Sequence, residues 1–275
     1  MSPQFPIPLE KSAVRSPAAA WLLAPWHCIG LGIGILYWAV CGSLLTVTAA
    51  ILHVILPRSV AEKTGKRILH GLFRIFLRLI GTLGLVKADI RALDALRSEK
   101  GVILAPNHAA LWDAVFIVSR LPRVTCVMKP SILKNPFLGG GARLAGYIAG
   151  LPVTHMIRLA EKQLAAGGQL LFFPEGTRTS PDARWINPLG GGCALIARRA
   201  RVPVQTIFIR TDSRFLQKGW SVFKRPPFPI RVHIELGPVL IPGENESPQD
   251  FTQRVSNIFE QHLPRPHPLR RQIES

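Results

Sequence analysis

Val102-Ile-Leu-Ala-Pro-Asn-His-Ala-Ala-Leu-Trp-Asp113 is one of two blocks that share a layout, and the other is Gln169-Leu-Leu-Phe-Phe-Pro-Glu-Gly-Thr-Arg178. Each block begins with a strand-length apolar run and passes directly into polar residues. Such runs, bounded by proline and polar residues, predict buried strands. In open α/β sheets, ligands bind at the carboxyl ends of the strands. Both blocks therefore predict a strand that carries polar residues at its ligand-binding end.

Similar apolar runs recur from about Lys87 onward. They are rich in β-forming residues, and they cover 101–105, 123–128, 168–173, 203–209 and 230–236. Helical stretches lie between them, at Leu111–Ser119, Met156–Ala166 and Gly192–Arg201. Strands that alternate with helices predict an α/β fold, with a mostly parallel sheet flanked by helices. We assign this domain to residues 87–263, followed by a flexible tail at 264–275.

The N-terminal part of the chain is apolar. After a polar tail at residues 1–15, the segment 16–57 contains no Asp, Glu, Lys or Arg. A membrane span needs about 20 apolar residues, so this segment is long enough to be transmembrane or membrane-embedded. One long tilted helix is possible, and so is a helical hairpin weakened in its middle by Gly30, Gly32 and Gly34. A buried core helix of a soluble protein is the third alternative.

Residues 58–86 alternate basic and apolar side chains with the period of a helix. This pattern predicts a basic amphipathic helix. After a membrane segment we expect an interfacial helix on anionic headgroups, with the domain at residues 87–263 facing the cytoplasm. An ordinary amphipathic helix that covers the core is the alternative. The residues that set the pattern are Lys63, Lys66, Arg67, Arg74 and Arg78, with Ile68, Leu69, Leu72, Phe73, Phe76 and Leu79 between them.

The chain is strongly basic. Its 275 residues hold 34 Lys and Arg against 16 Asp and Glu, a formal charge of +18, and the mean hydropathy of +0.23 is high for a soluble protein. Such a field attracts anionic lipids, phosphorylated substrates or an acidic carrier protein. Nucleic acid is disfavoured as a partner, because zinc-ligand spacing, a basic-zipper pattern and an RNA-binding aromatic signature are all lacking.

The first block carries a histidine and an aspartate. A neutral imidazole can take a proton from a hydroxyl near pH 7, and it needs a partner on its other ring nitrogen to fix the tautomer. If a helix begins after His108, Asp113 can reach back to the imidazole. The chain has no G-x-S-x-G elbow, so His108 would activate a hydroxyl of the substrate itself. A structural histidine is the simpler alternative. A metal pair lacks support from any H-E-x-x-H cluster.

The second block supplies groups suited to a phosphate or a polar head. Gly176 permits close backbone approach, and Thr177 and Arg178 offer hydrogen-bond donors. Taken alone, this segment could be a turn with an exposed charge. Following a strand, and in this order after the first block, it favours a binding site instead.

Taken together, the motifs Asn107-His108-x4-Asp113 and Phe173-Pro-Glu175-Gly-Thr-Arg178 resemble those of the glycerolipid acyltransferase family. The resemblance covers residues 85–240, and its further matches are Lys129, Leu133 and Pro136, Gly190-Gly191-Gly192 with Ala197, and Val202-Pro203-Val204.

This resemblance implies a membrane-associated O-acyltransferase. Its donor would be acyl-CoA or acyl-carrier protein, and its acceptor a lysophospholipid such as 1-acyl-glycerol-3-phosphate, at the inner or cytoplasmic membrane. No metal or redox cofactor is implied. His108 would be the base and Asp113 its orienter. The residues implied in substrate binding are Asn107, Lys129, Glu175, Gly176, Thr177 and Arg178.

One segment departs from the family pattern. Members usually carry Gly-x-x-Phe-Ile-Asp-Arg or Val-x-Arg, whose arginine holds the acceptor phosphate. Here Thr154 and His155 stand near that place, and the arginine is displaced to Arg158. Arg158 could take over from a helix, or the acceptor head could differ. A non-catalytic, membrane-anchored lipid-binding protein and a thioester hydrolase remain alternatives.

Overall fold

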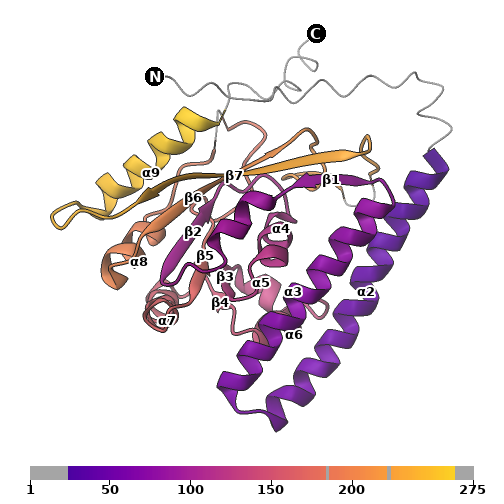
Figure 1. Cartoon of the computed structure of the whole chain (residues 1–275), viewed down its shortest axis with the longest axis horizontal. Coiled ribbons are helices and arrows are strands. Elements are labelled where there is room, and N and C mark those ends of the chain that lie inside the picture. The colour runs from indigo at the N-terminus through magenta and orange to yellow at the C-terminus, as the bar shows by residue number, and fades with distance from the viewer. Residues whose placement is uncertain (1–23, 184–185, 222–223, 264–275) are drawn as a thin grey trace.

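The computed structural model describes residues 24–183, 186–221 and 224–263; the predicted tails at 1–15 and 264–275 lie outside these ranges. A single seven-stranded sheet forms the centre, in the order β1-β7-β6-β2-β5-β3-β4 (Figure 1). The strands are β1 (Val86–Asp89), β2 (Val102–Pro106), β3 (Val124–Met128), β4 (Ile148–Ala149), β5 (Gln169–Leu171), β6 (Val204–Thr211) and β7 (Ile230–Leu240).

Helices precede the sheet, connect its strands and follow the last strand. They are α2 (Ala24–Ile55), α3 (Arg58–Thr82), a 3₁₀ helix (Arg91–Leu96), α4 (Asp113–Arg120), α5 (Pro130–Leu133), α6 (Gly139–Leu144), α7 (Val153–Ala165), α8 (Gly192–Ala200) and α9 (Pro248–His262). The predicted helices correspond to α4, α7 and α8, each within a few residues of the expected bounds.

The predicted mostly parallel sheet is confirmed. Every strand pair runs parallel except β6 with β7, which is antiparallel. Strand β2 lies in the middle of the sheet, and all five of its residues are buried. A strand covered on both faces needs apolar side chains at every position, which explains its unbroken apolar run.

The sheet is covered on both faces. One core contains Leu104 of β2 with Phe76 of α3 and Phe116 of α4. The other contains Ile103 of β2 with residues of α7, α8 and α9. Successive strand residues point to opposite faces, so β2 anchors both cores, and its carboxyl end is held rigidly between them.

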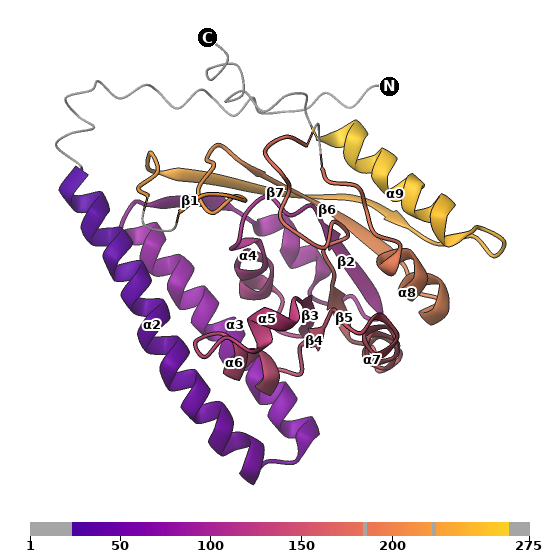
Figure 2. The ribbon, with the colours of Figure 1, turned by 180° about the vertical axis from the view of Figure 1, so that it is seen from behind.

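Residues 24–55 form a single uninterrupted helix, α2, as the one-helix alternative predicted. The hairpin is formed instead by α2 with α3, which run side by side along one flank of the domain (Figures 1 and 2). The glycines do not break α2 because they serve its packing: a Cβ on Gly34 would meet Phe76, and one on Gly42 would lie 2.5 Å from the carbonyl oxygen of Phe137.

The outer face of α2 is apolar and exposed. Within the described ranges, α2 is the one helix long and apolar enough to cross a membrane, with a mean hydropathy of 2.0 over its best window, of which 17% is buried. Its large exposed side chains recur at intervals of three, four or seven residues, and so form a stripe along one face. We call this set the α2 stripe: Trp26, Ile29, Leu36, Val40, Leu44, Val47, Ile51 and Val54.

Helix α3 turns its apolar face inward. Leu69, Phe76 and Ile80 are buried, and the helix contacts α2, α4 and α6. The apolar face of the predicted amphipathic helix therefore covers the core. Its exposed basic residues are Arg58, Lys63, Arg67, Arg74 and Arg78. That this basic face meets anionic headgroups stays a prediction.

Candidate active site

The two sequence blocks meet at one edge of the sheet. Strands β2 and β5 pair in parallel, with Leu104 beside Leu171, so both end at the same edge. His108 follows β2, and Glu175 follows β5. The site therefore lies where parallel α/β sheets place their ligands, and residues far apart in the sequence build it together.

His108 and Asp113 form a hydrogen-bonded pair. The His108 Nδ1 lies 3.0 Å from the Asp113 Oδ2, and the same oxygen accepts a bond of 2.8 Å from the backbone N–H of Ala110. Asp113 is the first residue of α4, so the start of this helix brings it back beneath the imidazole. Because Nδ1 donates to the carboxylate, Nε2 keeps its lone pair and can accept a proton.

The two members of the pair differ in exposure. The Asp113 side chain is 2% exposed and that of His108 is 17% exposed. Burial raises the pKa of Asp113, while the bond to His108 and the backbone N–H groups oppose that rise. A carboxylate held in this way orients the imidazole and stabilises the imidazolium that forms during proton transfer.

Phe173 packs on the imidazole of His108. The two ring centroids are 4.1 Å apart and the rings are inclined by 27°, a stacked arrangement. The stack closes one face of the imidazole, and the bond to Asp113 holds its edge. His108 is thus fixed in one orientation, as a positioned general base requires.

Asn107 is tied to the neighbouring strand β6. Its side-chain Nδ2 donates to the carbonyl of Ile209 at 3.0 Å, and its Oδ1 accepts from the N–H of Ile209 at 2.7 Å. The amide thus extends the pairing of β2 with β6 beyond the end of β2. Its predicted part in substrate binding stays a prediction, while these contacts give it a positioning role for His108.

Glu175 joins the two blocks. Its Oε1 accepts a bond of 2.8 Å from the backbone N–H of His108. Its Oε2 accepts one of 2.8 Å from the N–H of Asn187, and the Thr179 hydroxyl contacts both oxygens. Burial raises the pKa of Glu175, and these bonds oppose the rise. All of these contacts are with the protein itself, so the carboxylate positions the site. The predicted role of Glu175 in binding the acceptor stays a prediction.

Lys129 and Thr177 come together beside the pair. Lys129 follows β3, and its Nζ lies 3.3 Å from the Thr177 Oγ1. Gly176 has a φ of +64°, a region that favours glycine, and a Cβ there would meet no atom within 4 Å. The site thus has an exposed ammonium and a hydroxyl on the β3 side of His108.

Arg178 forms its hydrogen bonds on the β6 side of the site, opposite Lys129. Its Nη1 donates to the carbonyl oxygens of Leu216 and Gln217, at 2.9 and 3.1 Å. These bonds hold the loop after β6 against the second block. The part of Arg178 in substrate binding, which the resemblance implies, stays a prediction.

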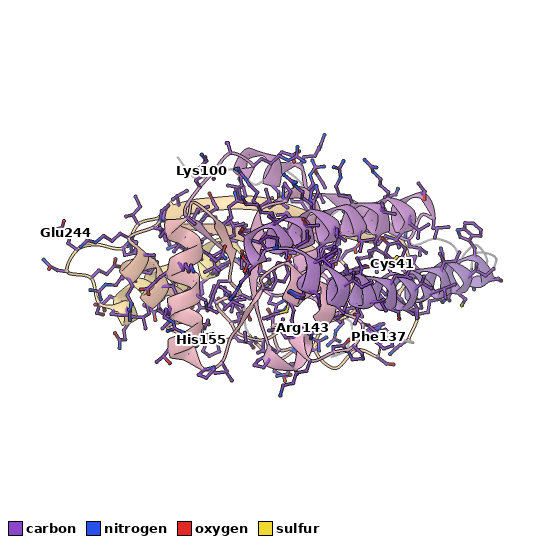
Figure 3. All side chains as sticks on the ribbon, turned by 90° about the horizontal axis from the view of Figure 1, so that it is seen from below. Cys41, Lys100, Phe137, Arg143, His155 and Glu244 are labelled. Atoms are coloured by element: carbon purple, nitrogen blue, oxygen red, sulfur yellow. The ribbon has the colours of Figure 1, made fainter. Side chains whose placement is uncertain are left out.

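Arg158 stands apart from this cluster. It lies on α7, and its Nη2 is 3.0 Å from the His155 Nδ1. Figure 3 shows His155 near one end of α7, on the same side of the molecule as Arg143 and Phe137 and opposite Lys100. Among the described contacts, none joins Arg158 to Lys129 or Thr177. The structure brings together every other predicted site residue and leaves Arg158 at the margin.

Several contributors to the site are not among the residues that the sequence predicts for it. Thr179 and Asn187 bind Glu175, Phe173 stacks on His108, and Ile209 pairs with Asn107. Phe173 is the first residue of the second motif and Thr179 directly follows that motif; these positions are the one local signal. Within the described ranges, no group of three or more His, Cys, Asp or Glu could hold a metal ion.

Comparison with known sequences identifies similar proteins. Residues 87–210 match the family model described as Acyltransferase. The 1-acyl-sn-glycerol-3-phosphate acyltransferase of Pseudomonas aeruginosa is 24% identical over 197 residues, which cover 68% of this chain and 73% of that protein. The enzyme of the same name from Saccharomyces cerevisiae is 24% identical over 150 residues, 49% of this chain and 47% of that protein.

The fold is similar to a solved structure, that of the 1-acyl-sn-glycerophosphate (LPA) acyltransferase PlsC from Thermotoga maritima. The TM-score is 0.64 with 18% identity, over 86% of this chain and 95% of that one. At this identity the likeness is one of fold, and it confirms the predicted α/β architecture.

Proposed function

Because the chain belongs to the glycerolipid acyltransferase family and is an acyltransferase, we propose that it acylates a free hydroxyl of a lysophospholipid. The acceptor class is that named for its relatives, 1-acyl-sn-glycerol-3-phosphate. The donor is an acyl thioester of coenzyme A or of a carrier protein. The observation that carries the proposal is the His108–Asp113 pair, which leaves the Nε2 of His108 available as a base.

The proposed reaction begins at the Nε2 of His108. Nε2 takes the proton of the acceptor hydroxyl while its oxygen attacks the thioester carbonyl, and a C–O bond forms in a tetrahedral oxyanion. Collapse of this intermediate breaks the C–S bond, and the imidazolium returns its proton to the departing thiolate. The products are an ester and a free thiol. Asp113 stabilises the transient imidazolium, so the proposed chemistry uses no metal or redox cofactor.

The acceptor head group is proposed to lie on the β3 side of His108. Lys129 and Thr177 are 3.3 Å apart there, and an ammonium beside a hydroxyl suits a phosphate. This pair would serve in place of the arginine that the family carries after β4. Arg158, exposed and bonded to His155, contributes less to that contact.

Thiol release from acyl-CoA tests the proposal against its rivals. Release that depends on an added lysophospholipid supports transfer, and mass spectrometry of the lipid products identifies the acceptor. Release without an acceptor would instead indicate a thioester hydrolase. The absence of release with every donor and acceptor would favour a non-catalytic lipid-binding protein.

We also propose that the α2 stripe attaches the protein to the inner or cytoplasmic membrane. Its exposed apolar side chains would lie among acyl chains, and the exposed basic residues of α3 would meet anionic headgroups. An excess of Lys and Arg marks the cytoplasmic side of a membrane protein, so the catalytic domain would face the cytoplasm. This arrangement brings the lipid acceptor to the site.

A further inference from the structure

A hollow in the protein surface lies beside the active site, in the loop between β6 and β7. Its volume is about 210 Å³, and its lining combines cationic side chains, an amide and an indole without any carboxylate. That combination suits a ligand carrying both phosphate groups and a flat aromatic ring. The lining residues are Arg214, Gln217, Lys218, Gly219, Trp220 and Lys224.

The cations of this hollow are not neutralised by the protein. Across the described ranges, no ion pair joins Arg214, Lys218 or Lys224 to a carboxylate, although many other arginines of the chain are paired. The one acidic residue of the loop, Asp212, is engaged by Arg231. The Lys224 Nζ lies instead 5.0 Å from the centre of the Trp220 ring. Three cations around one hollow, none with a carboxylate partner among the described residues, favour an anionic ligand.

The hollow is fixed relative to the catalytic residues. The carbonyl of Leu216 accepts bonds of 3.0 Å from the N–H of Leu111 and 2.9 Å from the Arg178 Nη1. Leu111 belongs to the His108 block and Arg178 to the Glu175 block. Leu216 has a φ of 60°, which a non-glycine residue rarely adopts and which the surrounding bonds must maintain. The loop is therefore bound to both catalytic blocks.

We propose that this hollow binds the adenosine 3′,5′-bisphosphate end of an acyl-CoA donor. The phosphates contact Arg214, Lys218 and Lys224, and the adenine stacks on Trp220. The pantetheine arm then extends from the hollow toward His108 and presents the thioester. This assignment rests on the proposed function, which requires a thioester donor. A small concave hollow with an aromatic wall fits a nucleotide, whereas a carrier protein would need a broad docking surface.

Binding of adenosine 3′,5′-bisphosphate to the full chain in detergent micelles tests the proposal by titration calorimetry. The double variant Lys218→Gln/Lys224→Gln removes two cations, and Trp220→Leu removes the stacking face. Each should raise the Kd at least about tenfold, since a stacked base or a pair of charge-assisted contacts has that effect. An unchanged Kd in both, or no measurable binding to the unaltered chain, would overturn the assignment.

A matched control removes the same charge elsewhere. Lys100 precedes β2 and Lys162 lies in the last turn of α7, and Figure 3 shows Lys100 on the side of the molecule opposite His155. Lys100→Gln/Lys162→Gln should leave the Kd within twofold of its original value. An equal loss of binding in this control would mean that net charge, not the hollow, attracts the nucleotide, and would overturn the proposal.

Glycerol 3-phosphate tests the other source of phosphate, the acceptor head group. If it displaces the nucleotide at similar concentration, the hollow holds the acceptor and the proposal fails.

With acyl-CoA as donor, the double variant Lys218→Gln/Lys224→Gln should raise the donor KM about tenfold. With an acyl-pantetheine thioester, which lacks the nucleotide, the donor KM should not change. A chain that binds the nucleotide through the hollow but transfers no acyl group would refute the proposed reaction and support the nucleotide site.

Discussion

The carboxylate of Glu175 accepts a hydrogen bond from the backbone N–H of His108 at 2.8 Å. A residue of the second block thereby holds the main chain of the first block at His108, the proposed base. The contact joins the two blocks to each other independently of any substrate. Glu175 acts through His108 and the loop around Asn187, so we describe it as a positioning residue.

Glu175→Gln should lower both stability and acyl transfer. A glutamine has only one side-chain oxygen, and its NH₂ group would face the N–H of His108 or Asn187. An unsatisfied buried donor costs about 1–3 kcal/mol, so calorimetry should show a lower Tm. Glu244→Gln, at an exposed site on the loop before α9, is the matched control. A Glu175→Gln protein with the original Tm and kcat would show that the carboxylate positions nothing.

His108→Ala should abolish acyl transfer and leave the fold intact. Loss of a positioned general base typically lowers the rate about 10²–10⁴-fold, and the imidazole is partly exposed, so its removal opens only a small gap beside Phe173. The kcat/KM and the Tm should be measured on the same preparation. Turnover like that of the unaltered protein would rule out the mechanism.

Asp113→Asn should be nearly as severe, because it removes the charge that stabilises the imidazolium and can reverse the tautomer of His108. The measurement is again kcat/KM with a lysophospholipid acceptor. A loss of less than about tenfold would assign Asp113 a structural role only.

Lys129→Gln should raise the KM for a phosphorylated acceptor about tenfold, since a hydrogen bond to a charged group contributes about 1.5–3 kcal/mol. The donor KM should change little. Arg158→Ala should have a smaller effect, because that side chain is exposed and bonded to His155. Lys134→Gln, a nearby exposed lysine, is the matched control. If Arg158→Ala alone weakened the phosphorylated acceptor, the head group would lie at α7 instead.

Leu36→Gln/Leu44→Gln in the α2 stripe should weaken binding to phospholipid vesicles at least tenfold, because each buried leucine contributes about 1.5–3 kcal/mol. Both side chains are more than 60% exposed, so the fold should be retained. Val239→Gln/Ile241→Gln, at exposed apolar positions in and just after β7, is the matched control. Equal sedimentation of both variants with vesicles would mean that the α2 stripe does not face lipid.

Lys66→Met should stabilise the protein at neutral pH, and the gain should shrink in alkali. Burial lowers the pKa of Lys66, with Glu62 opposing the shift. The folded state therefore disfavours the charged form, and this cost disappears as pH rises through the lowered pKa toward the ordinary value of 10.5. The stability difference should be measured by thermal unfolding of the variant and the unaltered protein at several pH values up to about 10. A pH-independent difference would contradict the burial of this lysine.

Local patterns predict much of the fold and part of the site. The unbroken apolar run of β2 signals a strand buried on both faces, and the spacing of His108 and Asp113 across a helix start places their side chains together. Each of these inferences depends on residues close in sequence. They hold because strand burial and the first turn of a helix are governed by near neighbours.

Contacts between distant segments were not predictable in this way. The bond from His108 to Glu175 spans 67 positions, and Arg178 reaches a loop 38 positions away. Both depend on the order of strands in the sheet. The course of α2 likewise depends on distant residues. From the sequence, its glycines could either interrupt the helix or allow another segment to approach it closely. In the structure they allow close approach, of Phe76 at Gly34 and of Phe137 at Gly42.

The pairing of Asn107 with Ile209 has a consequence for synthesis. The two residues are 102 positions apart, and domains generally form as the chain leaves the ribosome, beginning from the N-terminus. On the membrane attachment proposed above, a nascent chain would expose α2 to lipid long before Ile209 has been made. Until then the segment that carries His108 would lack this lateral partner. We therefore expect a membrane-bound fragment to be inactive until β6 is in place, so that a prematurely terminated chain would reach the membrane without acylating its lipids.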